Sequence, residues 1–355
     1  MVDLYILDKD LNTIGIIDDY SSLIWATRYN DIGDCEVYVQ ANQRALNLLI
    51  RGNYITRLDD DMICRIEKVE LDTDIENGNY LIVTAYDCKK ILKQRIIWTQ
   101  TNFNGTVENF IRQLISENLI YPNNEVRKIN YFVMTDETNG FTDTIEEQVS
   151  YANLGEKVIE LCKTFQYGFK VVLKTNASGI NYFLFSLYKG EDRSDSVIFS
   201  PEFENLLATT YVNDGSGLTN FALIGGEGEG AERKLAEAFS SPRNPTGMNR
   251  FEMFVDAKDL STKLDDGVIL SPSTYFNNLR TRGLEQLSEH QILTTFEGSI
   301  ESDTTFKLNQ DYFLGDIVSV ENEYGIGLPA RITEIVETID ENGRSVEPKF
   351  EYMEV

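Results

Sequence analysis

The fold class is decided by residues 63–86, ICRIEKVELDTDIENGNYLIVTAY, which predict two strands joined by a turn. Apolar and polar side chains alternate from Ile63 to Leu71 and again from Tyr80 to Tyr86, the period of a half-buried strand. The Asn77-Gly78 pair between them is a strong hairpin signal. This part of the chain is therefore expected to form antiparallel sheet.

More short strands surround this hairpin in the first hundred residues. They are expected at residues 4–7, 13–17, 22–29, 35–39 and 54–58. The turn after the first of them contains Asp8, Asp10 and Asn12, which also resemble the start of a calcium loop. Thr13 occupies the position of the required glycine and no glutamate closes the loop, so a hairpin turn is the better interpretation. Strands at this spacing predict an antiparallel barrel or sandwich.

Helical patterns appear in the next hundred residues. One helix is expected from Thr106, which can cap it, and a second from about 153 to 165. Strands at 169–173 and 181–187 follow the second helix. This combination predicts a small α/β domain.

The remainder returns to strands, with one helical interruption. Strands are expected at residues 209–212, 220–224, 251–256, 293–300, 316–320 and 330–337. A helix is expected from Tyr275 to His290, and Asn342-Gly343 marks a hairpin turn before the last strand.

Length and charge limit the classes of function. The 355 residues exceed the ~250–300 at which one hydrophobic core stops growing, so more than one core is expected. With 58 acidic and 32 basic residues, the formal net charge is −26. Such a charge disfavours binding to nucleic-acid backbones and to anionic membranes.

The cysteines and the N-terminus indicate synthesis in a reducing cytoplasm. Cys35, Cys64, Cys88 and Cys162 form no CxxC pair, so buried free thiols are expected instead of a disulfide framework or zinc site. The first residues lack the features of a signal peptide, and no apolar run approaches the ~20 residues of a membrane helix.

The glycine-rich stretch at 225–230, GGEGEG, is the first candidate for chemistry. Its spacing matches neither the dinucleotide fingerprint nor the P-loop, and Glu227 and Glu229 would place carboxylates against a phosphate. We expect an exposed, flexible hairpin tip.

His290 is the only histidine, and its polar helical surroundings predict a surface position instead of a catalytic one. Carboxylate clusters such as Asp59-Asp60-Asp61 and Asp265-Asp266 are common in so acidic a chain. No catalytic, cofactor-binding or metal-ligating residue is therefore predicted, and no cofactor and no enzymatic activity are expected.

Several blocks spread along the chain together resemble the tail hub, or baseplate hub, proteins of siphophages and related prophages. The blocks are WATRY at 25–29, GDCEV at 33–37, YDC at 86–88, LKQRII at 92–97, FSPEFENL at 199–206, residues 225–233, RFEMFVDAKDL at 250–260, DYFLGDIVSV at 311–320 and residues 343–350. Each block is short, and their order and spacing carry the resemblance.

The resemblance implies an α+β, mainly β fold with two antiparallel β-barrel-like tube domains. The first would span residues 1–96, followed by a small α/β domain at 97–200. The second would combine 201–239 with 291–355, and an inserted domain at 240–290 would lie between its strands. Three chains would close into a ring that continues the tail tube.

The same resemblance implies a structural role in a phage or prophage tail tip, where the ring anchors tail-tip proteins. Expected partners are two further copies in a homotrimer, a distal tail or tail tube protein, a tape-measure protein, and receptor-binding or lysin proteins. Viral DNA would be a partner only in transit, and an acidic lumen would let it pass without binding. The expected location is the virion tail tip, after synthesis in the bacterial host cytoplasm.

Two other classes of function stay open at this point. A host cell-wall carbohydrate-binding module could use the 18 Tyr and 19 Phe residues to hold sugars. A cell-wall hydrolase could use two carboxylates in one cleft. Binding to cell walls without assembly partners would favour the first, and loss of peptidoglycan release on a single Glu substitution would favour the second.

Overall fold

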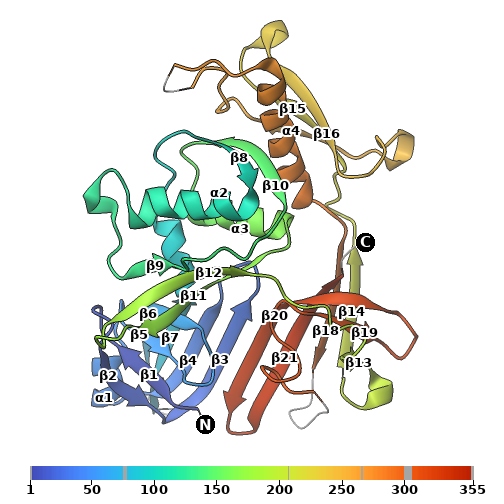
Figure 1. Ribbon diagram of the computed structural model, residues 1–355. Helices are drawn as coiled ribbons and strands as arrows, with labels where there is room; N and C mark the ends of the chain where they lie inside the picture. Colours follow the sequence, from blue (N-terminus) through green and yellow to red (C-terminus); the bar gives the residue numbers. More distant parts are fainter. Residues whose placement is uncertain (1, 75–77, 207, 265–266, 300–305, 353–355) are drawn as a thin grey trace.

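The computed structural model describes residues 2–74, 78–206, 208–264, 267–299 and 306–352 (Figure 1). Asn77 of the predicted turn, the Asp265-Asp266 pair and Ile300 lie outside these ranges. The described chain is mostly strand, with several sheets and a few helices, so the predicted α+β, mainly β class is confirmed.

Most strands belong to one 13-stranded sheet. They are β1 (Leu4–Leu7), β2 (Thr13–Ile17), β3 (Tyr20–Arg28), β4 (Asp34–Gln40), β5 (Tyr54–Thr56), β6 (Ile63–Asp74), β7 (Gly78–Asp87), β13 (Ile198–Phe199), β14 (Ala208–Asp214), β18 (Leu293–Ser299), β19 (Ile317–Glu321), β20 (Gly327–Asp340) and β21 (Gly343–Tyr352). The path is β14-β18-β21-β20-β3-β4-β7-β6-β5-β1-β2, with β19 also paired to β20 and β13 to β19. The N-terminal and C-terminal strands thus share one sheet, blue beside red in Figure 1.

The strands predicted around residues 63–86 pair as expected. β6 and β7 are antiparallel, with Cys64 opposite Asp87 and Val69 opposite Val83. Cys64 and Ile66 are buried, but Val69 and Leu71, further along the strand, are exposed. The register shifts between Ile66 and Lys68, and this β-bulge keeps Val69 on the same face as Ile66 although three positions separate them.

The first hairpin is also confirmed. β1 and β2 pair, and one carboxylate oxygen of Asp8 accepts hydrogen bonds from the backbone N–H groups of Asp10 and Asn12, both at 2.9 Å. Leu11 completes the turn with a φ of 65°. The acidic residues there serve the turn itself. A short helix, α1 (Gln43–Leu48), follows β4 and was not predicted.

Residues 101–188 form an α/β unit on one side of the large sheet (Figure 1). Its elements are β8 (Thr101–Thr106), α2 (Val107–Ile115), β9 (Phe132–Met134), β10 (Thr144–Val149), α3 (Leu154–Thr164), β11 (Gly168–Thr175) and β12 (Asn181–Tyr188). Both predicted helices are present, capped by Thr106 and Asn153, whose side-chain oxygens accept backbone hydrogen bonds. β8 pairs with β10, and the second sheet has the order β11-β12-β9.

Residues 221–288 form a separate layer, which we call the insertion unit. It contains β15 (Phe221–Gly225), β16 (Leu235–Phe239), β17 (Glu252–Asp256) and α4 (Pro272–Ser288). The three strands form their own sheet, with β15 in the middle, and α4 packs on it. This pairing differs from the expected start of the insertion at residue 240. β15 pairs with both β16 and β17, and none of the three joins the large sheet.

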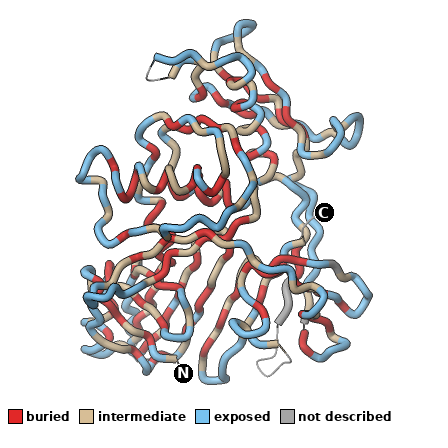
Figure 2. Tube along the Cα trace, viewed as in Figure 1, coloured by how far each residue is buried: buried red, intermediate tan, exposed pale blue. Residues whose placement is uncertain are grey.

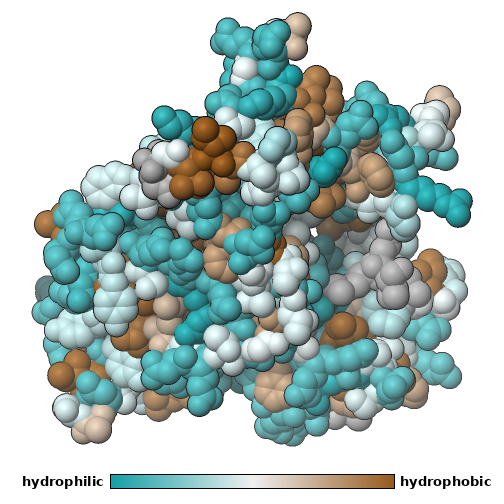
Figure 3. Space-filling view, turned by 45° about the horizontal axis from the view of Figure 1, so that its top comes forward, coloured by the Kyte–Doolittle hydropathy of each residue, from teal (hydrophilic) through white to brown (hydrophobic). Residues whose placement is uncertain are grey.

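Within the described ranges, most buried hydrophobic residues fall into four clusters. The α/β unit shares its cluster with the first strands, since Leu7, Ile63 and Cys88 belong to it. The insertion unit has a cluster of its own, around Ile224, Tyr275 and Leu279. Buried stretches accordingly run through each layer in Figure 2. On the face drawn in Figure 3, hydrophobic residues form separate groups within a mainly hydrophilic surface.

Candidate functional site: the junction between the strand sets

The glycine-rich stretch joins β15 to β16, so the predicted hairpin position is confirmed. Glu227 accepts hydrogen bonds from the Thr262 hydroxyl at 2.6 Å and from the Lys234 ammonium at 2.9 Å, which lower its pKa. Gly228 has a φ of +100°, and a Cβ there would lie 2.5 Å from the Glu232 carbonyl oxygen. Gly225 and Gly226 are buried and only residues 228–230 are exposed, so the expected exposed tip is shorter than the glycine-rich stretch.

His290 lies just beyond α4 and is partly exposed. Its Nδ1 is 2.8 Å from the carbonyl oxygen of Gln286, one helical turn earlier. All four cysteines are buried free thiols, as predicted, and burial raises the pKa of Cys64 and Cys88 well above the ordinary value. Among the described residues, no group of three or more His, Cys, Asp or Glu could hold a metal ion.

The N-terminal and C-terminal strands meet where β3 pairs with β20. Trp25 stands opposite Glu337 in this register, and both side chains are buried. The Arg57 side chain, fully buried, reaches Glu337 at 3.3 Å and Asp59 at 2.7 Å. Arg344 on β21 forms a second, short ion pair with Glu337. Two strand sets distant in sequence are thus joined by backbone pairing and by a buried charge network.

The electrostatics of this network favour the charged forms. Burial opposes the charge of Arg57, but the Asp59 and Glu337 carboxylates outweigh it and raise the pKa of Arg57. The indole N–H of Trp25 donates to Asp60 at 3.1 Å, and the Arg57 guanidinium lies 5.2 Å from the centre of the Trp25 ring. Burial raises the pKa of Asp60 above its ordinary value. We call Trp25, Arg57, Asp59, Glu337 and Arg344 the junction network.

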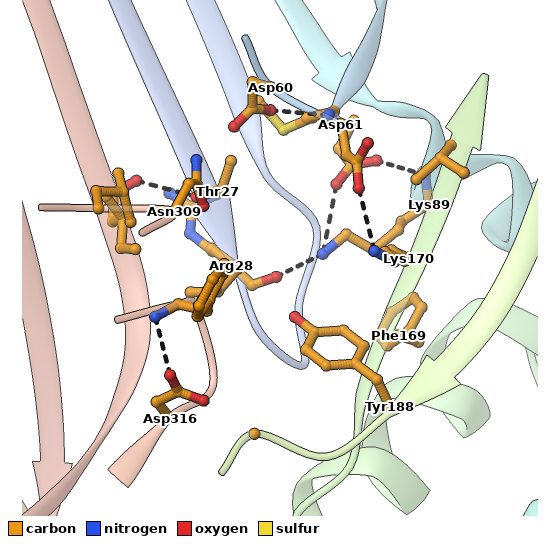
Figure 4. Close-up of a pocket in the computed structure, with 18 of the residues that line it drawn as sticks. Thr27, Arg28, Asp60, Asp61, Lys89, Phe169, Lys170, Tyr188, Asn309 and Asp316 are labelled. Carbon is orange, nitrogen blue, oxygen red and sulfur yellow. Dashed lines mark hydrogen bonds and ion pairs between the residues drawn. The ribbon is translucent and has the colours of Figure 1, made fainter. Parts of the chain in front are cut away.

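A cavity of about 770 Å³ opens beside the junction network. Its walls come from the end of β3, the loop at 58–62, β11, the segment after β12 and the loop at 308–316. Figure 4 shows Arg28, Lys89 and Lys170 around this space, with Phe169 and Tyr188 on the side of the α/β unit. The cavity therefore lies where three parts of the chain meet.

The charges that line the cavity are paired. Lys89 lies 3.4 Å from Asp87 and donates to the Arg28 carbonyl oxygen at 2.5 Å, while Lys170 lies 3.1 Å from Asp61. Arg28 pairs with Glu334 at 2.7 Å, and Lys189 and Arg193 also have carboxylate partners. Burial raises the pKa of Asp87. This lining suits a solvated joint between structural parts, because its cations are already neutralised.

Asp316 holds the segment after β12 against the second strand set. Its carboxylate accepts from the Arg193 side chain at 2.7 Å and from the backbone N–H of Glu191 at 2.8 Å. A Cβ on Gly190 would lie 1.9 Å from the Gly315 carbonyl oxygen, so the two backbones can approach only because this residue is glycine.

Sequence reasoning assigned no role to the junction residues. Asp87 and Asp316 lie in the blocks YDC and DYFLGDIVSV, which carried the resemblance, but the blocks did not show that these acids are buried. The burial of Glu337 could have been predicted from the strand pattern. Ile335, Glu337 and Ile339 occupy every second position of β20 and are all buried, so the acid lies on the apolar face of the strand.

The two ends of the main path of the large sheet, apart from the β19-β13 branch, are open edges. β2 pairs only with β1, and β14 only with β18, among the described residues. Ile14 on β2 and Tyr211 and Val212 on β14 are between 39% and 43% exposed. Open edges carry unpaired backbone groups and can pair with another chain. They are the second candidate site.

No helix in the described ranges is both long and apolar enough to cross a membrane.

Comparisons with known proteins agree with this architecture. The family model described as Siphovirus ReqiPepy6 Gp37-like protein matches residues 3–350. No curated protein sequence matches the chain.

Three solved structures share the fold over nearly the whole chain at 11–13% identity. A tail protein from Neisseria meningitidis MC58 is 11% identical with a TM-score of 0.57, covering 99% of this chain and 96% of that one. The 43 kDa tail protein of prophage MuSo2 from Shewanella oneidensis is 12% identical, with a TM-score of 0.54 and 98% of both chains covered. Prophage tail protein gp18 from Listeria monocytogenes EGD-e is 13% identical, with a TM-score of 0.51, covering 99% of this chain and 94% of that one. The chain has the fold of these phage and prophage tail proteins, and it belongs to the family described as Siphovirus ReqiPepy6 Gp37-like protein.

Proposed function

We propose that this chain is a structural subunit of a phage or prophage tail tip, where three copies form a hub ring that continues the tail tube. The observation that carries the proposal is the pair of open edges, β2 and β14, at opposite ends of one sheet. These edges are different surfaces, so contact between them is head-to-tail, and such contacts close into a ring when the rotation fits.

The two strand sets and the two smaller units would have different roles in the ring. The N-terminal strands and the C-terminal strands would each supply one barrel-like wall segment per chain, giving six segments in a trimer. The junction network would fix the angle between the two segments, because Arg57, just after β5 of the N-terminal strands, binds Glu337 on β20. The α/β unit and the insertion unit would lie outside this wall and contact other tail proteins.

The net charge of −26 supports a role for an acidic inner wall. Repulsion from the phosphate backbone removes the counterion-release gain that holds DNA to basic channels, so DNA could slide through. A trimer structure with a neutral or basic inner wall would overturn this part.

The proposed partners are a distal tail or tail tube protein, a tape-measure protein, and receptor-binding or lysin proteins at the tail tip. The proposed location is the virion tail tip, after synthesis in the host cytoplasm. We propose no catalytic role. The paired charges of the cavity support a joint between structural parts more than a reaction centre.

Ring formation can be tested by electron microscopy and mass photometry of the purified chain, alone and with its distal tail protein. We expect particles with threefold symmetry. A double change on the open edge, Tyr211→Lys with Val212→Lys, should abolish them, because lysines on an edge strand block pairing.

Val126→Lys is the matched control, since Val126 is 86% exposed in the α/β unit, away from both edges. This variant should form rings like the wild type. A chain that forms no threefold particle with its partner present, or rings that persist in the edge variant, would contradict the proposal.

A further inference from the structure

The insertion unit is attached to the α/β unit by polar groups. Its hydrophobic cluster is separate from that of the α/β unit. The contacts between them include Ser261 with Gln148 at 2.8 Å, Thr281 with the Glu146 carbonyl oxygen at 3.2 Å, and Thr164 with Ser288 at 3.1 Å. An interface held by hydrogen bonds can separate and re-form without exposing a large apolar surface.

A buried cluster of charges lies at the centre of this interface. The Lys157 ammonium on α3 is 3% exposed and contacts Glu285 on α4 at 2.7 Å, Glu160 at 3.4 Å and, in a short ion pair, Glu147 on β10. Arg282 on α4 lies 3.7 Å from Glu285. The ion pair between Glu285 and Lys157 joins the insertion unit to the α/β unit.

The cluster has more acids than bases. The charged groups that face one another across α3, α4, β10 and the loop after β17 are Glu147, Lys157, Glu160, Asp259, Arg282 and Glu285. Two buried carboxylates, Glu147 and Glu285, and the partly buried Glu160 therefore share one ammonium and part of one guanidinium, because Arg282 also pairs with the half-exposed Asp259 at 3.2 Å. Both oxygens of Glu147 and one of Glu285 have no hydrogen-bond partner. An uncompensated buried charge is costly, so this geometry favours retention of a proton.

We propose that this carboxylate–lysine cluster is a pH-sensitive latch that holds the insertion unit closed against the α/β unit and loosens when all three carboxylates are ionised. The proposal concerns movement within one chain, so it goes beyond the hub role and does not depend on ring formation.

The direction of the pH effect follows from the docked state. Burial raises the pKa of Glu285 to about 7, helped by the neighbouring Glu147 charge, and burial likewise raises the pKa of Glu160 to about 7. In the open state both groups would titrate near the ordinary 4.5. The docked state therefore binds protons more tightly. Docking is strongest at low pH, weakens as the pH rises from about 4.5 to about 7, and is constant above that.

Energy transfer between two fluorophores would report the latch. One label would replace Met248, 93% exposed in the insertion unit, and the other Asn109 on the exposed face of α2. The native thiols are buried, so Met248→Cys and Asn109→Cys label selectively. Between pH 5 and 8 we expect transfer to fall, with the docking equilibrium constant dropping about tenfold per pH unit for each proton released within the window.

Glu285→Gln and Glu160→Gln should each flatten this response and keep the unit docked at pH 8, because an amide cannot ionise. Glu160 is 17% exposed, so its variant should fold even if the change at Glu285 is not tolerated. Glu289→Gln, at an exposed residue ending the same helix, is the matched control and should respond like the wild type. Far-UV circular dichroism would confirm folding. Transfer that does not change with pH in the wild type, or an unchanged response in both glutamine variants, would overturn the proposal.

Discussion

Glu337→Gln tests whether the junction network holds the two strand sets together. The wild-type carboxylate is 3% exposed and contacts two guanidinium groups, those of Arg57 and Arg344. The amide has the same shape but carries no charge. In the variant two cations would face only one acid, Asp59, which is 38% exposed.

The expected cost can be estimated from the burial of each partner. Removing one member of a buried ion pair destabilises a protein by about 3–5 kcal/mol. Arg57 would keep its bond to Asp59 at 2.7 Å, so we expect the lower end, about 3 kcal/mol in the free energy of unfolding. Glu347→Gln is the matched control, because Glu347 lies exposed on the neighbouring strand β21. Its cost should stay within about 0.5 kcal/mol.

Urea unfolding followed by Trp25 fluorescence would measure both changes. Trp25 is fully buried in the network, and the Trp98→Phe background removes the signal of the other tryptophan. A paired replacement, Arg57→Met with Glu337→Leu, should return stability to within about 1 kcal/mol of the wild type. Arg344 and Asp59, 3.7 Å apart and both about 40% exposed, can then pair with each other. A Glu337→Gln variant that matches Glu347→Gln would refute the reasoning.

Three further predictions use other features of the chain. A water-soluble thiol reagent should react slowly with the folded protein and with all four cysteines after unfolding, because all four are buried and burial raises the pKa of the Cys88 thiol; fast reaction when folded would contradict this. Gly190→Ala should cost about 1–3 kcal/mol in unfolding free energy, since its Cβ would meet the Gly315 carbonyl at 1.9 Å, whereas Gly217→Ala, with open space around it, should cost far less. Asn153→Ala should lower the free energy of unfolding by about 1 kcal/mol, because the cap of α3 is lost. Asn123→Ala, at an exposed residue, should be nearly neutral, and thermal unfolding would measure both.

Elements with local signals could be predicted from the sequence. The turn at Asp8 depends on a side chain bonding to the backbone two and four residues later, and the caps of α2 and α3 act over three residues. Such interactions are complete within one window of sequence. The three longer helices accordingly lie within a few residues of their expected bounds.

Pairing between distant strands could not be predicted in the same way. β3 and β20 meet across some 300 residues, and the alternation of each strand fits many partners equally well. The residues of β15 and β16 are expected in the second barrel-like domain, but they pair in the insertion unit, because an apolar strand pattern does not show which surface buries the strand. The structure supplied these pairings.

The buried charges were missed because an acidic residue is ordinarily solvated. Lys157 and Glu285 are on helices 128 residues apart, and neither helix alone shows that the polar side faces another unit. A buried acid can be predicted from the sequence only where it takes the place of an apolar residue in an alternating strand, as Glu337 does.

The placement of these buried charges follows one rule across the molecule. Arg57 and Glu337 join the two strand sets, Asp316 and Arg193 fix the segment leading into the second set, and Lys157 and Glu285 join the insertion unit to the α/β unit. In each case the ions lie between parts of the chain and not within one hydrophobic cluster. Buried ion pairs add little net stability over apolar contacts of the same shape, but they tolerate only one arrangement of their partners. We infer that these ion pairs fix the angles between the parts of the chain. Replacing them with apolar residues should preserve stability but let the angles vary. A ring closes only at one rotation between copies, so such a variant should form fewer closed rings.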